Sequence, residues 1–519
     1  MSAIDEKLPS FGRAILLGSV FLVAASGLVY ELVAGAVSSY LLGDAVTQFS
    51  LVIGVFLSAM GGGAFLAQYV RQRLLYRFVE VEIWLGLLGG CSSVLMFAVS
   101  AFADAIFPVF FYLLCIILGV LIGLEIPLLI RLLQAARGVS ETLSHVLALD
   151  YLGALIGSML FPLFVLPYLG LSRASVVFGL LNLAVAASAV PLLRQGERIL
   201  LAAQMTLAMT LLLATFAYST KWVGFLEDKL YQDDIIYTAD TRYQRIVLTR
   251  WRDDIRLYLN GQLQFSAVDE ARYHESLVIP AMEASRPAAD VLILGGGDGM
   301  AAREVLKYDS VKTITLVDID PAMTALGQTR PELLRLNSGS LSSPKVKIVN
   351  TDAMRFVEES RDAFDVIFID LPDPDTETLS KLYSDAFYRL CVRRLRERGI
   401  MVTQATSPFF ARDAFWCIAQ TIASVEIPNL PETSLHILPY HLNIPSFGEW
   451  GFVMAARRPV APQQLAISVE TRFLNDATLH SMFAFGKDIE PPSPLPNINR
   501  LEHPILSTYY ERGWSRFNE

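Results

Sequence analysis

In the second half of the chain, several aspartates come at or just after the end of an apolar run. One apolar run leads into Gly295–Gly299, whose sequence is Gly-Gly-Gly-Asp-Gly, and later runs end in Asp318, Asp352 and Asp370. Glycines let a ligand approach the backbone closely, and carboxylates accept hydrogen bonds from hydroxyl and amine groups. The glycine segment matches neither common phosphate-binding pattern, and Asp298 within it would repel a phosphate. These residues favour a cationic ligand that carries a nucleoside, of the S-adenosylmethionine kind.

Alternating strands and helices must position these residues. An apolar strand precedes the glycine segment, and a helix is expected over residues 301–308. The five expected strands are 291–294, 313–317, 345–349, 364–369 and 400–405. This alternation predicts a parallel, doubly wound sheet, which binds ligands outside the carboxyl ends of its strands. There Asp318 can accept both ribose hydroxyls and Asp352 can bind an adenine amino group.

A smaller β domain is expected just before this sheet. Residues 245–249 and 256–259 are rich in β-formers, and Asn260-Gly261 is a strong hairpin signal. Residues 269–285 then predict a helix.

The first 220 residues have a different character. They hold 10 Lys and Arg and 11 Asp and Glu, whereas residues 221–519 hold 32 and 40. A helix needs about 20 apolar residues to cross a bilayer. Seven runs qualify: 14–40, 49–70, 81–102, 105–133, 145–170, 173–193 and 199–219. Gly61–Gly63, Gly153 and Gly157 would let such helices pack closely.

Lys and Arg predict the orientation of these helices, because cytoplasmic loops are enriched in both. The basic residues of one side are Lys7, Arg13, Arg71, Arg73, Arg77, Arg131, Arg137, Arg194 and Arg198, against Arg173 alone on the other. This places the N-terminus in the cytoplasm, and seven crossings would then place the second half outside. The second half would instead lie in the cytoplasm if run 145–170 or 199–219 did not cross completely, or if a break near Glu31 divided the first run.

Three acidic residues lie in or near the apolar runs, namely Glu31, Glu125 and Asp150. A carboxylate in hydrocarbon costs a few kcal/mol, so each should face the bundle interior. Two interpretations stay open: a path for a cation such as a polyamine, or structural hydrogen bonds.

The composition argues against several classes of protein and of site. The second half is acidic, which disfavours nucleic-acid binding. The four cysteines form no CxxC pair, and the six histidines form no paired ligand motif, so we expect neither a disulfide framework nor a metal.

Residues 240–455 resemble the spermidine synthases, or polyamine aminopropyltransferases, and the whole chain resembles the multipass membrane branch of that family. The segments that carry the resemblance are Tyr243–Ile246, Leu259–Gln264, Asp269-Glu270, Tyr273–Glu275, Gly295–Gly299, Asp318–Asp320, Asp370 with Asp373-Pro374, Thr403–Ala405 and Trp450–Phe452. The resemblance implies a multipass α-helical membrane domain plus an α/β Rossmann-like, S-adenosylmethionine-methyltransferase-like doubly wound domain with a small antiparallel β domain. The expected boundaries are 1–220, 235–285, 286–458 and a C-terminal tail at 459–519.

The resemblance also implies an activity and its residues. Such enzymes transfer the aminopropyl group of decarboxylated S-adenosylmethionine, a cosubstrate rather than a permanently bound cofactor, to an amine, usually putrescine. Asp370 would then be the base, helped by Tyr273. The implied cosubstrate-binding residues are Gln244, Gly295, Gly297, Asp298, Asp318, Asp352 and Ala353. The implied amine-binding residues are His274, Asp373, Gln264, Gln404 and Phe447.

Some positions depart from the family pattern. The loop after Asp373 is Pro374–Thr378, one residue longer than usual, and Phe447 replaces a common tyrosine. Asp318 replaces the glutamate that the family usually has at this position. Asp352-Ala353 replaces the usual Asp-Gly. The first two changes bear on which amine is accepted.

The partners implied are putrescine or a related polyamine, a lipid bilayer and a second copy of the chain through the small β domain. Because the cosubstrate is made in the cytoplasm, the resemblance implies an inner-membrane enzyme with a cytoplasmic catalytic domain. Two alternatives stay open: an S-adenosylmethionine-dependent methyltransferase, and a polyamine transporter or sensor. An Asp370→Asn variant would lose turnover in an enzyme but could keep transport.

Overall fold

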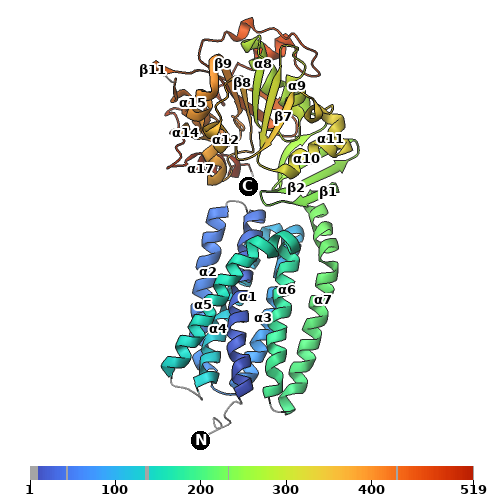
Figure 1. The fold of residues 1–519 in the computed structure, drawn as a ribbon, viewed down its shortest axis with the longest axis vertical. Helices are drawn as coiled ribbons and strands as arrows, with labels where there is room; N and C mark the ends of the chain where they lie inside the picture. Colours follow the sequence, from blue (N-terminus) through green and yellow to red (C-terminus); the bar gives the residue numbers. More distant parts are fainter. Residues whose placement is uncertain are drawn as a thin grey trace. The chain divides into compact units, whose positions relative to one another are not determined.

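The computed structural model describes residues 10–42, 45–134, 139–193, 195–231, 233–427 and 430–517. The chain divides into a helical unit, Met1–Ile235, and a second unit, Ile236–Glu519, which we call the catalytic unit (Figure 1). Lys7, Arg137 and Arg194, which were used to predict orientation, lie outside the described residues.

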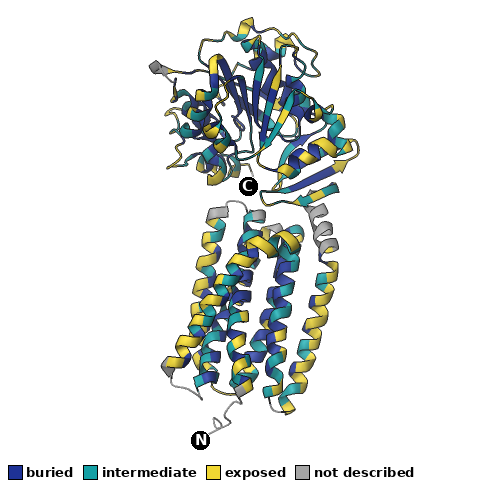
Figure 2. Cartoon of the chain, viewed as in Figure 1, coloured by how far each residue is buried: buried dark blue, intermediate teal, exposed yellow. Residues whose placement is uncertain are grey.

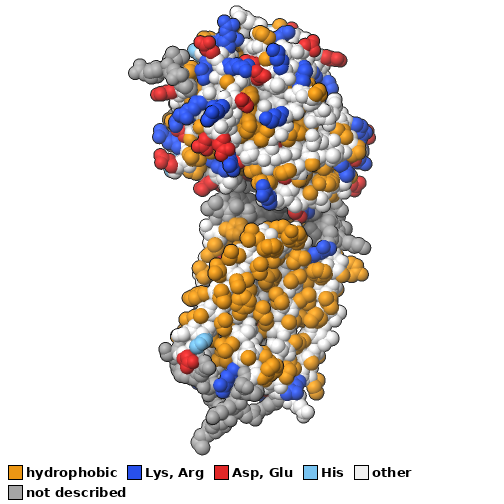
Figure 3. All heavy atoms as spheres, viewed as in Figure 1, with side chains coloured by type: hydrophobic (Ala, Val, Ile, Leu, Met, Phe, Trp, Pro, Cys, Tyr) orange, Lys and Arg blue, Asp and Glu red, His pale blue; other side chains and the backbone are white. Residues whose placement is uncertain are grey.

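The helical unit is a bundle of long helices. They are α1 (Ser10–Leu42), α2 (Ala45–Leu66), α3 (Leu74–Phe102), α4 (Phe107–Leu133), α5 (Val139–Leu160), α6 (Leu166–Ala189) and α7 (Gln195–Tyr231). Many of their large apolar side chains are exposed, among them Leu57, Val109 and Tyr151. Figure 3 shows apolar side chains covering the visible face of this unit, whereas charged side chains gather on the catalytic unit. Such an apolar surface is typical of helices that contact lipid.

Six stretches of the described residues are long and apolar enough to cross a membrane, one fewer than the seven runs predicted. The difference arises because Glu141–Leu192 counts as one stretch of 52 residues. Within it, α5 continues through a π-helical turn at Phe161–Val165 into α6. Gly170 interrupts α6 with a φ of 68° and a ψ of 175°, and this break separates the predicted runs 145–170 and 173–193.

Glycines bring several helices into backbone contact, as predicted for Gly63, Gly153 and Gly157. A Cβ at Gly63 of α2 would lie 2.2 Å from the Val120 carbonyl oxygen of α4. One at Gly153 of α5 would lie 2.3 Å from the Phe21 carbonyl oxygen of α1. The prediction was wrong for Gly61 and Gly62, since a Cβ at either position would have no described atom within 4 Å.

The catalytic unit contains a sheet of seven strands in the order β12-β13-β9-β8-β5-β6-β7. The parallel strands are β5 (Asp290–Gly295), β6 (Thr313–Asp318), β7 (Val346–Asn350), β8 (Phe364–Asp370) and β9 (Leu395–Gln404). These are the five strands predicted. Two antiparallel strands, β12 (His436–Ile444) and β13 (Gly448–Ala456), extend the sheet beyond β9.

Apolar cores cover both faces of this sheet, so the doubly wound fold is confirmed (Figure 2). Ile293 packs into the core that contains Leu277, and its neighbour Leu294 packs into the core that contains Phe387. The surrounding helices are α8 (Glu270–Ser285), α9 (Met300–Val305), α10 (Pro321–Thr329), α11 (Pro331–Leu336), α12 (Ala353–Glu359), α13 (Glu377–Ser380), α14 (Asp385–Arg394), α15 (Arg412–Ala423), α16 (Asp476–Ser481) and α17 (Leu506–Ser515).

A four-stranded antiparallel sheet precedes this fold, as predicted. Its strands are β1 (Asp234–Asp240), β2 (Arg245–Trp251), β3 (Asp254–Leu259) and β4 (Gln262–Ser266), in that order. Asn260 and Gly261 both have positive φ, 51° and 84°, which is the geometry of the predicted tight turn. A short ribbon of β10 (Glu426–Ile427) and β11 (Leu430–Ser434) lies later in the chain.

Candidate active site

The glycine segment after β5 lies against the ends of β6 and β8. Gly295 pairs with Asp370 across the sheet and has a φ of 87°. A Cβ there would lie 1.9 Å from the Asp370 carbonyl oxygen, and one at Gly297 would lie 2.4 Å from Asp318 Oδ2. Only glycine therefore allows this turn to bring both aspartates to one edge of the sheet.

Asp370 ends β8 and meets Tyr273 of α8. The Tyr273 hydroxyl donates to Asp370 Oδ1 at 2.7 Å. Burial raises the pKa of Asp370 to about 6, and the neighbouring Asp298 adds to the effect. Burial also raises the pKa of Tyr273 well above its usual value, so this hydroxyl stays a donor. The structure thus holds one carboxylate ready to accept a proton near neutral pH.

Asp373 lies one loop further along and is held by three groups. Its carboxylate accepts hydrogen bonds from Gln404 Nε2 at 3.1 Å, from Thr406 Oγ1 at 3.3 Å and from the Tyr510 hydroxyl. Burial raises the pKa of Asp373 to about 7. Thr406 has a φ of 56°, which a β-branched residue rarely adopts, so local strain accompanies this contact.

Tyr510 comes from α17 in the C-terminal tail, and our sequence reasoning did not include it in the site. The tail is fixed against the catalytic unit because Trp514 stacks on Phe410, with ring centroids 4.7 Å apart. Asn499 also donates to the Ser380 carbonyl oxygen at 2.8 Å. The adjacent tyrosines at 509–510 are visible in the sequence, but no spacing relates them to Asp373. The tail therefore supplies a polar group to the site.

A Tyr510→Phe variant removes one donor to Asp373 and keeps the ring in place. We expect the KM for the amine to rise about 10- to 150-fold, because one hydrogen bond to a charged group contributes about 1.5–3 kcal/mol. Steady-state kinetics with varied amine would measure this. Tyr509→Phe is the matched control, and equal effects of the two variants would contradict a specific role for Tyr510.

Two further predicted amine-binding residues lie beside Tyr273. His274 forms an edge-to-face contact with the Tyr273 ring at 5.0 Å, and Phe447 does so at 6.1 Å. His274 Nδ1 lies 3.0 Å from Glu270 Oε2, and burial lowers the pKa of His274. By contrast, Gln264 donates to the Gln262 carbonyl oxygen on its own strand. Through Tyr273, these contacts connect His274 and Phe447 to Asp370, whereas the bond of Gln264 stays on its own strand.

The residues predicted to bind the cosubstrate form a second group. Asp318 accepts backbone N–H groups from Gly297 at 3.1 Å and from Asp320 at 2.8 Å. Burial raises the pKa of Asp318 to about 6. Gln244 Nε2 donates to Asp320 Oδ2 at 3.1 Å rather than to Asp318, so Asp320 links β6 to the small sheet.

Asp298 and Asp352 also have structural roles. Asp298 Oδ1 accepts the Met300 N–H at 2.8 Å, and Asp352 Oδ1 accepts the Arg355 N–H at 3.0 Å. Asp352 caps α12, whose first residue is the buried Ala353. The second oxygen of Asp352 lies 3.6 Å from Lys381 Nζ, whereas the helix-terminal bond of Asp298 uses only its Oδ1.

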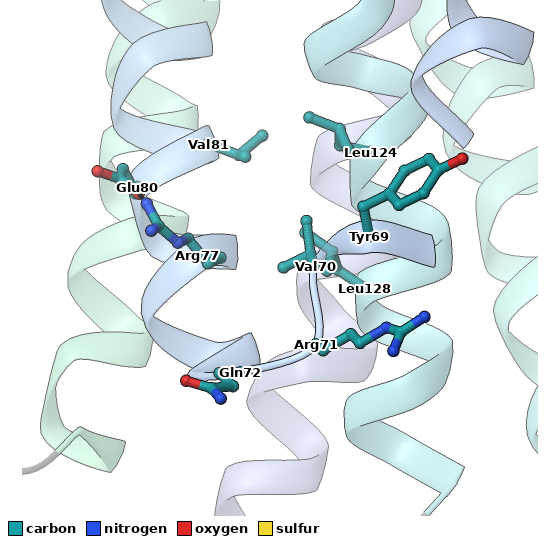
Figure 4. A pocket seen from close by; sticks show the side chains of 9 residues that line it. All are labelled: Tyr69, Val70, Arg71, Gln72, Arg77, Glu80, Val81, Leu124 and Leu128. Atoms are coloured by element: carbon teal, nitrogen blue, oxygen red, sulfur yellow. Dashed lines mark hydrogen bonds and ion pairs between the residues drawn. The ribbon is translucent and has the colours of Figure 1, made fainter. Parts of the chain in front are cut away.

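A pocket of about 600 Å³ lies elsewhere, in the helical unit. Figure 4 shows Val81 and Leu124 facing each other across it, with Arg77 beside Glu80. It contains none of the residues described above, so its size does not make it the candidate site.

A Rossmann-like sheet with carboxylates at its strand ends is typical of doubly wound enzymes that bind a nucleoside-containing ligand. Residues 270–459 match the model of the spermine/spermidine synthase domain. The chain is 46% identical to a polyamine aminopropyltransferase of Leptospira interrogans, over 96% of this chain and 98% of that protein. It is 45% identical to polyamine aminopropyltransferase 2 of Ralstonia nicotianae, over 97% of this chain and 98% of that protein.

A crystal structure of spermidine synthase in complex with the transition-state analogue AdoDATO is 26% identical, with a TM-score of 0.45 over 49% of this chain and 87% of that one. The full-length relatives show that the chain belongs to the polyamine aminopropyltransferase family. It is an enzyme that transfers aminopropyl groups to polyamines, with decarboxylated S-adenosylmethionine as its cosubstrate. The methyltransferase alternative is therefore wrong.

Proposed function

We propose that this chain transfers the aminopropyl group of decarboxylated S-adenosylmethionine to putrescine, which gives spermidine and methylthioadenosine. The observation that carries the proposal is the pair of half-buried carboxylates, Asp370 bonded to Tyr273 and Asp373 bonded to Gln404. Two carboxylates suit the two nitrogens of a diamine.

The reaction needs little help at the sulfonium, which is already a good leaving group. The amine is the obstacle, because a protonated nitrogen has no lone pair. Asp370 accepts a proton from the attacking ammonium, and Tyr273 orients the carboxylate. The freed nitrogen lone pair forms a bond to the aminopropyl carbon next to sulfur. The carbon–sulfur bond breaks with its electrons on sulfur, so methylthioadenosine leaves uncharged.

The other residues hold the amine nitrogen in line with the carbon–sulfur bond that breaks. This alignment of the two reactants accelerates the reaction. Asp373 binds the distal ammonium of putrescine, with Gln404 and Tyr510 fixing its carboxylate. Asp298 binds the ammonium of the aminopropyl group. Asp318 binds the ribose, with Gln244 acting through Asp320, and Asp352 and Ala353 frame the adenine.

Product analysis with an amine panel tests the choice of acceptor. Full-length chain in detergent would receive decarboxylated S-adenosylmethionine with putrescine, cadaverine or spermidine at equal concentrations. We expect the highest kcat/KM with putrescine, and spermidine as the new amine. A higher kcat/KM with cadaverine or spermidine would overturn putrescine as the acceptor while leaving aminopropyl transfer intact.

The pH dependence follows from the raised pKa values of Asp370 and Asp373. Both must be ionised, Asp370 to accept a proton and Asp373 to bind an ammonium. Since their pKa values are about 6 and about 7, we expect kcat/KM for the amine to rise with pH and to level off only above about pH 7. Stopped assays from pH 5 to 8 would measure it. A flat profile between pH 5.5 and 7.5 would contradict the assignment.

We further propose that the helical unit spans the inner membrane and that the catalytic unit faces the cytoplasm, where the cosubstrate is made. The six apolar stretches support membrane insertion. A green fluorescent protein fused after residue 519 should fluoresce in cells, because it does not mature after export in unfolded form. Signal from a C-terminal alkaline phosphatase fusion instead would place this end outside.

A further inference from the structure

Two carboxyl groups face each other inside the helical unit. Glu82 of α3 and Glu125 of α4 are both 0% exposed, and their side chains interact with each other. None of their four oxygens has a hydrogen bond of normal geometry to another described group. Among the described residues, no Lys, Arg or His forms an ion pair with either one. Our sequence reasoning identified Glu125 but not Glu82.

Two more polar side chains without hydrogen-bond partners in the described part of the chain pack against α3, within two turns of Glu82. The Tyr30 hydroxyl and both polar atoms of the Asn182 side chain are buried and make no hydrogen bond within the described part of the chain. Tyr30 of α1 interacts electrostatically with both glutamates and crosses α3 at Gly89, where a Cβ would lie 2.6 Å from its ring. Asn182 of α6 packs against Gly86, one turn from Glu82.

Helix packing alone does not explain this group. Two adjacent ionised carboxylates in a low-dielectric interior repel strongly, and each buried polar atom left without a partner costs about 1–3 kcal/mol. An anchor of apolar helices needs none of these residues. Acidic residues in membrane-spanning segments instead mark paths or sites for cations.

We propose that Glu82, Glu125, Tyr30 and Asn182 form a site for a primary ammonium group. The inference rests on the proposed membrane insertion, but not on the identity of the amine acceptor. An alkylammonium has three N–H donors and no acceptor, and the site offers carboxylate, amide and phenol oxygens to meet them. A monovalent cation leaves the occupied pair neutral when the second carboxyl keeps its proton. The polyamines of the established reaction carry such groups, so they are the ligands to test.

The site is closed in this structure, so a ligand must enter by movement of the helices. The π-helical turn at Phe161–Val165 and the break at Gly170 lie in the α5–α6 segment that contributes Asn182. Such interruptions are frequent at functional sites of helical bundles.

Carbodiimide labelling tests the proposal, since this reagent modifies protonated carboxyl groups in apolar surroundings. Full-length chain in liposomes would be treated with dicyclohexylcarbodiimide, with and without spermidine or putrescine, and labelled peptides would be located by mass spectrometry. We expect label on Glu82 or Glu125, reduced at least threefold by the amines but not by sodium at equal charge. Labelling without protection, or no labelling of folded protein, would overturn the ammonium site.

A variant pair adds an independent measurement. Glu82→Gln should lower binding of radiolabelled spermidine to the liposome-embedded chain by one site per chain, whereas Glu80→Gln, two residues away on the same helix, should not. Aminopropyl transfer assayed on the same samples should be unchanged in both variants. Equal spermidine binding by the two variants would contradict the proposed ammonium site. Absence of aminopropyl transfer in the unsubstituted chain would instead contradict the proposed function.

Discussion

Replacing Asp370 with Asn is expected to lower kcat by about 10²–10⁴-fold, the range that a positioned general base contributes. Asparagine keeps the size of the side chain and can still meet the Tyr273 hydroxyl, but it cannot accept a proton from the ammonium. We therefore expect the KM for decarboxylated S-adenosylmethionine to change little. Initial rates of methylthioadenosine release at saturating amine would measure the effect.

The exposed Asp309 provides the matched control, because Asp309→Asn removes the same charge outside the site and should leave kcat within twofold. Thermal unfolding separates lost chemistry from lost folding. The pKa of Asp370 is raised in the folded chain, so its contribution to stability is lost as pH rises through about 6. Asp370→Asn should therefore be no less stable than the parent at pH 8. Unchanged kcat in the variant would refute Asp370 as the base.

Asp373→Ala is expected to raise the KM for putrescine by about 30- to 5,000-fold, corresponding to about 2–5 kcal/mol for truncating one partner of a hydrogen-bonded charge pair. The carboxylate is the only group proposed to neutralise the distal ammonium, and its loss also leaves Gln404 without one hydrogen-bond partner. Steady-state kinetics with each substrate varied would show the change in the amine KM and not in the cosubstrate KM.

Glu377→Gln is a suitable comparison, since Glu377 begins the helix α13 that follows this loop and is exposed. It should change the amine KM by less than twofold. If Asp373→Ala instead raised the cosubstrate KM and left the amine KM unchanged, Asp373 would belong to the other half of the site.

The central sheet could be predicted because its signals are local. The inner strands β5 and β8 are apolar runs that are buried on both faces, whereas β7 at the edge of the sheet is only partly buried. In the small sheet, Asn260-Gly261 encodes its own turn. The added strands β12 and β13 were not predicted. Their pairing with β9, such as Phe452 with Gln404, is a long-range contact that no local pattern specifies.

The helical unit shows a similar limit. Hydropathy located every apolar run, but it could not show that two of them form one bent stretch. The φ of 68° at Gly170 is a conformation that glycine permits and does not require. Glu82 was not predicted because it lies near the start of the apolar run 81–102. A charged side chain at the end of such a run usually reaches the polar surface of the membrane.

The residues of the candidate site were predictable in part. Asp370, Asp373, Tyr273 and Gln404 meet in the structure, and their roles stay predictions until tested. Gln264 bonds to its own strand, and Gln244 donates to Asp320, a residue that was not among the predicted site residues. Tyr510 could not be found from spacing, because 137 residues separate it from Asp373 and only the packing of α17 brings them together.

The most direct test of the account counts products in one reaction. Purified full-length chain would be incubated with decarboxylated S-adenosylmethionine and putrescine, and both methylthioadenosine and spermidine would be quantified over time. The account predicts one spermidine for each methylthioadenosine, no methylthioadenosine without amine, and loss of both products in Asp370→Asn. Folded protein that forms no methylthioadenosine with any amine, or forms it equally without one, would contradict the account.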